Sequence, residues 1–135
     1  MIAEKVKVVE DSAGEPTTRM KQIYEKVLNV MVTSHEIYNS DFSISTLADL
    51  VGEPYYEVSG AINCCYGNNF KTLLNDHRIQ KACRLLGDEN ISGRQTIESI
   101  AESLGFKSRT YFNAIFKKYT GLTPTVYIGL SKVKS

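Results

Sequence analysis

Basic and aromatic side chains gather in residues 105–121, which is the stretch best suited to bind a charged ligand. It carries Lys107, Arg109, Lys117 and Lys118 and no acidic residue, so its local charge is +4. Lysine and arginine bind phosphate groups, although on many helices they simply face water. Two interpretations are therefore open: a helix that lies against a polyanion, or an amphipathic helix with an aromatic core face and a solvated face.

The spacing of the apolar side chains places the basic ones on other faces of this helix. The inward stripe comprises Phe112, Ile115, Phe116 and Tyr119. These positions recur at intervals of three and four, as in an amphipathic helix. Arg109 falls in the first turn, where base edges are usually read, and Asn113 lies one turn further along. Because arginine pairs with guanine and asparagine with adenine, this face predicts readout of DNA sequence.

A unit made of a short helix, a glycine turn and a second helix occurs twice in the sequence. Ile44, Leu47, Ala48, Val51 and Gly52 have the same spacing as Ile97, Ile100, Ala101, Leu104 and Gly105. After the glycine the second copy has one more residue, and then Val58, Ile62 and Gly67 match Phe112, Phe116 and Gly121. Such a unit is a helix-turn-helix, whose DNA-binding forms place the second helix in the major groove.

The two copies differ in charge. Residues 53–67 contain Glu53 and Glu57 but no lysine or arginine, so they sum to −2. Tyrosine and asparagine in this stretch can still touch bases, and Gly60 permits a close approach. We therefore expect the second copy to contribute most of the attraction to a polyanion.

The remaining sequence predicts an all-α protein of about seven helices, with two helix-turn-helix subdomains joined by a linker helix. Thr17, Ser43, Thr96 and Ser108 are expected to cap the starts of four helices. The first helix is expected to begin after Thr17 and to continue to about Tyr38, and residues 87–95 are expected to form a loop. The predicted divisions are a tail or linker remnant at 1–16, the first subdomain at 17–67, the linker helix at 68–87 and the second subdomain at 88–135.

Two longer segments that include these motifs resemble a known protein family. The segment "IESIAESLGFKSRTYFNAIFKKYTGLTPTVY" closely resembles the pattern of AraC/XylS-type transcription regulators, and "LNDHRIQKACRLL" is similar to the linker helix of that family. Thr110 stands where the family more often has serine, and the first recognition helix lacks the basic residues common in the family. Arg78 on the linker is expected to pair with a carboxylate and fix the helix, or to touch phosphate.

The resemblance implies sequence-specific binding of double-stranded DNA for transcription regulation in the bacterial cytoplasm. Two recognition helices would enter successive major grooves, about 34 Å apart. The candidate DNA-contact residues are Tyr55, Tyr56, Ser59, Gly60, Asn63, Lys107, Ser108, Arg109, Thr110, Asn113, Lys117 and Lys118. The resemblance also implies an upstream sensor or receiver domain if this chain is a fragment of a longer regulator.

A second function remains open, in which the acidic first copy docks on RNA polymerase or on a partner domain. Enzymatic activity, a cofactor and a metal site are not expected. The three cysteines form no CxxC pair, only two histidines are present, and no glycine-rich phosphate loop occurs. No apolar run approaches the roughly 20 residues of a membrane span, so no membrane contact is expected from this segment.

Overall fold

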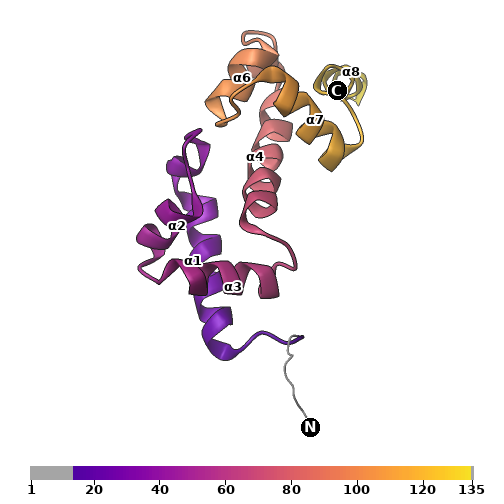
Figure 1. Cartoon of the computed structure of the whole chain (residues 1–135). Helices are drawn as coiled ribbons and strands as arrows, with labels where there is room; N and C mark the ends of the chain where they lie inside the picture. Colours follow the sequence, from indigo (N-terminus) through magenta and orange to yellow (C-terminus); the bar gives the residue numbers. More distant parts are fainter. Residues whose placement is uncertain (1–13, 135) are drawn as a thin grey trace. The chain divides into compact units, whose positions relative to one another are not determined.

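The structure is a computed structural model that describes residues 14–134, without the side chains of the last two, and it consists of helices and their connections (Figure 1). The elements are α1 (Thr18–Thr33), the 3-10 helix η1 (His35–Tyr38), α2 (Ile44–Val51), α3 (Tyr55–Cys65), α4 (Phe70–Leu86), α5 (Glu89–Ser92), α6 (Ile97–Ser103), α7 (Arg109–Thr120) and α8 (Pro124–Lys134). The all-α prediction is confirmed, with eight α-helices in the described residues. None of these helices is long and apolar enough to cross a membrane. Residues 1–13 of the predicted tail lie outside the described residues.

Side-chain caps explain where four of the helices begin. The hydroxyl oxygens of Thr17, Ser43, Thr96 and Ser108 each accept a hydrogen bond from a backbone N–H in the first turn of α1, α2, α6 and α7. Each cap satisfies a donor that the helix itself leaves without a partner. The four caps expected from the sequence are therefore confirmed, and they fix the start of both helices of the second helix-turn-helix.

Two elements differ from the sequence prediction. The first helix ends at Thr33 instead of continuing to Tyr38, because Ser34 adopts an extended conformation and the chain then forms the separate helix η1. The segment His35–Phe42 joins the second of two compact units, whereas α1 belongs to the first. The predicted loop at 87–95 contains the one-turn helix α5, whose first turn is capped by the Asp88 carboxylate.

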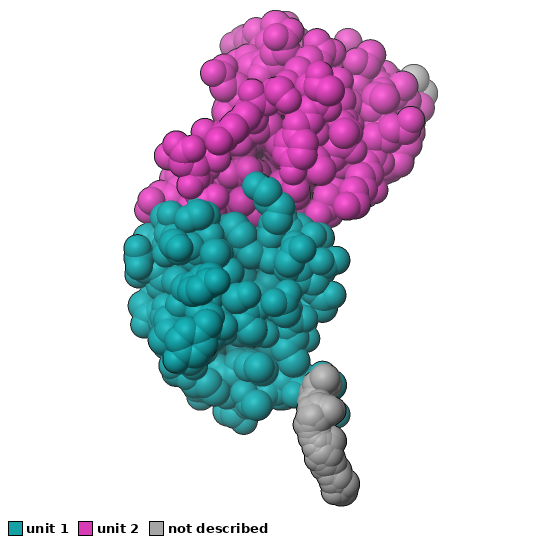
Figure 2. All heavy atoms as spheres, in the orientation of Figure 1, with its two compact units in different colours: residues 1–34, 43–73 teal, residues 35–42, 74–135 magenta. Residues whose placement is uncertain are grey.

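The chain divides into two compact units, and each has its own core (Figure 2). In the first unit α1, α2 and α3 contact one another and bury Ile23, Leu47 and Ile62, each at most 1% exposed. The second unit holds residues 35–42 and 74–135. Its core combines buried side chains of α4, α6, α7 and the turn between α6 and α7: Ile79, Ala82, Leu86, Ile100, Ala101, Leu104, Phe106, Phe112 and Phe116. Each helix-turn-helix thus has its own apolar support.

Candidate nucleic-acid interface

The repeat found by spacing is also a repeat of backbone geometry. All four residues with positive φ in the described chain are glycines, and they occupy matching places in the two copies. Gly52 and Gly105, at φ 72° and 94°, follow the first helix of each motif; Gly67 and Gly121, at 82° and 80°, follow the second. Glycine adopts this left-handed conformation without a steric penalty. A left-handed glycine therefore closes each helix of both copies, either as the C-cap itself (Gly52 and Gly121) or one residue after the C-cap (Gly105 and Gly67).

Matching apolar positions are buried in both copies. Ala48 and Ala101 are 4% and 2% exposed, and their small side chains let the two helices of each motif cross closely. Val58 and its counterpart Phe112 are fully buried in α3 and α7. The Phe112 ring packs against Phe106, with 5.0 Å between the ring centroids. These contacts fix which face of each second helix points outward.

The outward part of the second copy is cationic. Six of its candidate DNA-contact residues are exposed: Lys107, Ser108, Arg109, Thr110, Lys117 and Lys118. Helix α7 carries no acidic residue along its length, and Arg109 is its first residue, directly after the capping Ser108. Anions are favoured near the first turn of a helix, where backbone N–H groups are unpaired. The first turn of α7 therefore offers an anion two kinds of hydrogen-bond donor: backbone N–H groups that the helix holds in place, and the flexible guanidinium of Arg109.

Two of these cations have acidic neighbours within the second unit. The Arg109 guanidinium lies 3.6 Å from a Glu98 carboxylate oxygen, and the Lys107 ammonium lies 3.6 Å from Asp41. All four side chains are at least 43% exposed. Exposed pairs contribute about 0–1 kcal/mol, so a phosphate or a base edge can readily replace the carboxylates.

Asn113 differs from the other candidates because it is only half exposed. Its side-chain oxygen is buried and has no hydrogen-bond partner among the described residues. The residue sits at the border between the core face, marked by Phe112 and Phe116, and the outward face. A reading role for Asn113 therefore requires its amide to turn outward, which the sequence periodicity alone did not indicate.

Two exposed residues of α7 were not among the sequence candidates. Ala114 lies between Thr110 and Lys117 at intervals of four and three, so these three residues share one exposed row. A methyl group in such a row can contact the methyl group of thymine. Tyr111, 41% exposed, lies on a neighbouring row. The spacing from Thr110 was the available signal for Ala114, whereas Tyr111 was placed neither in the inward stripe nor among the candidate contacts.

In the first copy the outward row of α3 is aromatic and polar. Tyr55 and Tyr56 are 58% and 70% exposed, and Asn63 is exposed, whereas Ser59 and Gly60 are half-buried. Beside this row a hollow between α1 and α3 is lined by Tyr56 and Gly60 of the row, together with Thr17, Arg19, Met20, Ile23 and Glu57. A Cβ added at Gly60 would meet only Met20 Cε, at 4.0 Å, so the row is open at this position.

The acidic residues at the start of α3 are paired with basic residues of α1. Arg19 contacts Glu53 at 2.6 Å and Glu57 at 3.1 Å, and Lys26 contacts Glu53 at 2.7 Å. The hydrogen bond from Lys26 and the charge of Arg19 lower the pKa of the Glu53 carboxyl. The two cations offset the charge of −2 expected for the first copy, so α3 is not the repulsive surface that its own sequence suggests.

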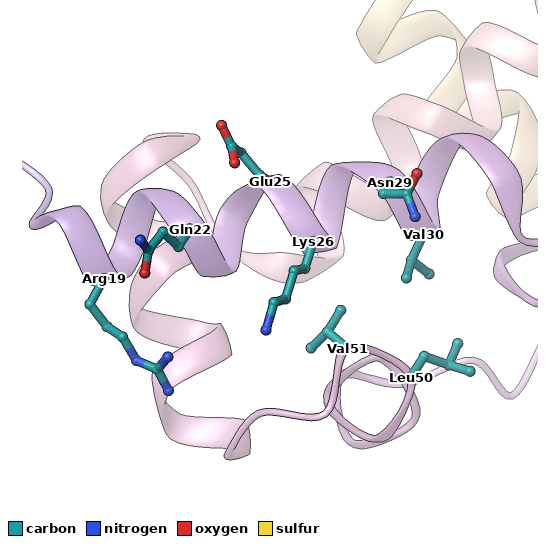
Figure 3. Close-up of a pocket in the computed structure, with 8 residues that line it drawn as sticks. All are labelled: Arg19, Gln22, Glu25, Lys26, Asn29, Val30, Leu50 and Val51. Carbon is teal, nitrogen blue, oxygen red and sulfur yellow. The ribbon is translucent and has the colours of Figure 1, made fainter.

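Figure 3 shows where these cations lie. Arg19 and Lys26 extend to the same side of α1, whereas Glu25 extends to the opposite side, and all three line a hollow of about 560 Å³ between α1 and α2. Val30, Leu50 and Val51 complete the hollow with apolar surface. The hollow is open and carries mixed chemistry, and we assign it no ligand.

Arg78 of α4 supports the turn of the second motif from beneath. It is 3% exposed, and its guanidinium donates to the backbone oxygens of Ile37 at 2.8 Å and Asn39 at 2.9 Å. It also lies over the Phe106 ring, 5.7 Å from the centroid. Burial lowers the pKa of this guanidinium. The expected carboxylate or phosphate partner is therefore replaced by backbone carbonyls, and the structural role is the one observed.

A family model described as a helix-turn-helix domain matches residues 39–129, more than half of the chain. The chain belongs to the AraC-type helix-turn-helix family. Its members are DNA-binding transcription regulators, and the matched region contains the linker helix and the whole second motif. The HTH-type transcriptional regulator GadX of Escherichia coli O6:H1 is 36% identical over 61 residues. Those residues are 45% of this chain and 21% of GadX, so the chain matches about a fifth of the length of its curated relative.

Solved structures agree with the AraC-type assignment. The C-terminal domain of the two-component response regulator yesN from Fusobacterium nucleatum is 28% identical, with a TM-score of 0.64. The alignment covers 79% of this chain and 98% of that domain. The DNA-binding domain of the transcription factor AdpA, solved in complex with a target DNA, has a TM-score of 0.66 at 20% identity and coverages of 83% and 94%. The likeness to AdpA is one of fold.

Proposed function

We propose that this chain binds double-stranded DNA sequence-specifically, with α7 in one major groove and α3 in the next. The observation that supports this most is the exposed row Thr110, Ala114 and Lys117 on an acid-free helix whose opposite face buries Phe112 and Phe116. An α-helix fits the major groove of B-DNA, and side chains of its outward row reach base edges. Because the N-terminal residues of a recognition helix contact base edges, we assign a base contact to Arg109, the first residue of α7, and a phosphate contact to Lys117, about two turns further along.

A salt series with single substitutions tests the assignment for α7. The ligand is a duplex selected from random DNA by the wild-type chain. Lys117→Ala is expected to reduce the slope of log affinity against log salt by about 0.9, because one phosphate contact is lost. Lys132→Ala is the matched control, since Lys132 is exposed on α8 and outside the proposed surface. An unchanged slope for Lys117→Ala would remove that residue from the interface.

Base-specific readout by Arg109 has a different expected signature. Arg109→Ala should relax discrimination at one base pair by about 1–3 kcal/mol, whereas loss of a phosphate contact weakens all sequences alike. The measurement is competition between duplexes that differ at single positions. Uniform weakening across all positions would make Arg109 a phosphate ligand.

For α3 we propose base contacts by Tyr56 and Asn63, whose row also holds Gly60, with the neighbouring row of Tyr55 and Ser59 close to the groove. The alternative is that this surface docks on RNA polymerase or on a partner domain, and its motivation was the acidic start of α3. The pairing of Glu53 and Glu57 with Arg19 and Lys26 weakens that motivation. Tyr56→Ala with Asn63→Ala should alter discrimination at the half-site distant from α7; unchanged DNA binding with lost activation in transcription would favour docking.

A sensor or receiver domain remains a prediction for a longer regulator. The relatives suggest it, since yesN is a two-component response regulator represented by its C-terminal domain. We place the proposed activity in the bacterial cytoplasm, where chromosomal DNA lies. Neither inference affects the DNA-binding test above, which needs only the chain described.

A further inference from the structure

Asn75 and Arg78 of α4 are the buried polar side chains of the described residues, at 4% and 3% exposed. They lie three residues apart and therefore on the same face of the helix. Arg78 is accounted for by the carbonyls of Ile37 and Asn39. The packing of the fold does not explain why Asn75 is buried. Its side-chain oxygen has no hydrogen-bond partner among the described residues, and its side-chain nitrogen donates to a residue of α7.

The partner of Asn75 is the hydroxyl of Tyr111, in the first turn of the recognition helix. Asn75 Nδ2 donates to Tyr111 Oη at 3.2 Å. The Tyr111 ring also packs against Phe106, with 6.0 Å between the centroids, and the Arg78 guanidinium lies over the Phe106 ring. Since the tyrosine oxygen accepts from Asn75, its own hydrogen remains to be donated to another acceptor.

The position of Tyr111 on α7 indicates what that acceptor is. Tyr111 is seven residues before Lys118, so the two side chains share a row that flanks the outward row of Thr110, Ala114 and Lys117. When an outward row meets base edges, the flanking rows face the walls of the groove, where phosphate oxygens lie. Phosphate oxygens accept hydrogen bonds and donate none.

We propose that Tyr111 is a further DNA-contact residue, which donates its hydroxyl hydrogen to a backbone phosphate, and that Asn75 is the positioning residue that aims this hydroxyl. This inference rests on the proposed DNA-binding function. It adds a link from the linker helix to DNA that passes through one hydrogen bond inside the second unit.

In the first copy, the residue equivalent to Tyr111 also accepts a side-chain hydrogen bond from an earlier helix. Glu57 is the counterpart of Tyr111 after the one-residue offset, and Arg19 Nε of the preceding helix α1 donates to its carboxylate at 3.1 Å. In each copy a longer helix that precedes the motif in sequence, α1 or α4, therefore contacts the third residue of the recognition helix. A carboxylate cannot donate to phosphate, so the contact belongs to the second copy alone.

The test is a double-mutant cycle in a salt series, with the full chain and the selected duplex. Tyr111→Phe removes one oxygen and is expected to weaken binding roughly tenfold at every salt concentration, as loss of a hydrogen bond to a charged group predicts. The salt slope should stay unchanged, because the hydroxyl carries no charge and releases no counterion. Asn75→Leu should weaken binding less, and the double variant should bind no more weakly than Tyr111→Phe.

Tyr127→Phe is the matched control, since it removes a hydroxyl from the same unit at α8, and its affinity should equal that of the wild type. Binding of Tyr111→Phe within about twofold of wild type, or a further loss when Asn75→Leu is added to it, would overturn the proposal. Lys117→Ala, measured in parallel, separates the two failures. If Lys117→Ala lowers the salt slope while Tyr111→Phe has no effect, only this inference fails; if the wild type selects no sequence, the proposed function fails.

Discussion

Gly105 and Gly52 occupy the same place in the two copies, yet their surroundings differ. Both have positive φ. A Cβ added at Gly52 would meet no heavy atom within 4 Å, whereas at Gly105 it would lie 2.8 Å from Arg78 Nη2 and 2.8 Å from the carbonyl oxygen of Tyr38. One glycine is therefore required by its backbone conformation alone, and the other by conformation and by lack of space.

Alanine at each glycine should separate these two causes. Gly52→Ala is expected to lower the free energy of unfolding by about 1–2 kcal/mol, the penalty for a left-handed alanine. Gly105→Ala should lower it by about 1–3 kcal/mol more, because Arg78 must move away from its carbonyl partners. Urea denaturation of the two variants measures the difference. Equal losses of unfolding free energy in the two variants would show that Arg78 moves aside at no cost in stability.

The buried guanidinium of Arg78 is expected to contribute to stability. Arg78→Leu removes two hydrogen bonds and leaves the carbonyls of Ile37 and Asn39 without that donor, so we expect a loss of about 2–4 kcal/mol of stability. Arg84, exposed on the same helix, is the matched control, and Arg84→Leu should change stability by less than about 0.5 kcal/mol. Similar effects from both substitutions in urea denaturation would contradict the structural role of Arg78.

At the scale of helices, α1 supports α3 through charges as well as through its apolar face. The Glu53 carboxyl has a pKa below its ordinary value of 4.5, first because Lys26 donates a hydrogen bond to it and then because of the charge of Arg19. A lowered pKa in the folded state means that this stabilisation is present above pH 4.5 and is lost as the pH falls through the folded-state value. The α1–α3 contact should therefore weaken in acid.

Glu53→Gln tests the acid sensitivity of the first unit. The wild type should lose more stability than the variant between about pH 7 and about pH 3.5, because the variant has no carboxylate to protonate at this position. Glu25→Gln is the control, because Glu25 lies on the side of α1 opposite to Arg19 and Lys26 (Figure 3), and this variant should behave like the wild type. The measurement is urea denaturation at both pH values, and identical pH dependence of Glu53→Gln and wild type would remove the ion pairs from the stability of this unit.

The helices and their caps could be predicted from the sequence because the signals are local. Apolar spacing gave the inward faces of α2, α3, α6 and α7, and Thr96 and Ser108 identified two starts through single hydroxyl groups. The repeat identified the turn glycines, because matching positions had to share a conformation. The exposed part of the candidate site followed from the same periodicity.

Contacts between elements distant in sequence could not be predicted in this way. Nothing local to Arg78 indicates that its partners are the carbonyls of Ile37 and Asn39, since those contacts exist only after η1 has joined the second unit. The bond from Asn75 to Tyr111 and the pairs that Arg19 makes with α3 have the same origin. The half-buried Asn113 shows the limit of periodicity, because a border position faces neither side fully.

At the scale of the whole molecule, two units with separate cores each present one helix-turn-helix. On the proposed function each unit reads its own half-site, and the second supplies most of the uncompensated positive charge. Substitutions in one unit should therefore change base discrimination in one half-site only. Insertion of about five base pairs between half-sites, which turns them to opposite faces of the duplex, should weaken binding sharply in a gel-shift titration. Unchanged affinity would mean that a single motif carries the binding.

Base-resolved interference mapping on the selected duplex shows whether two recognition helices bind successive major grooves, which is the main prediction for this chain. Modified bases that prevent binding are expected in two blocks in the major groove, with centres about one helical turn apart. Repeating the map with Arg109→Ala should erase interference within one block and leave the other intact. A single block, or binding that is indifferent to every modified base, would contradict the account.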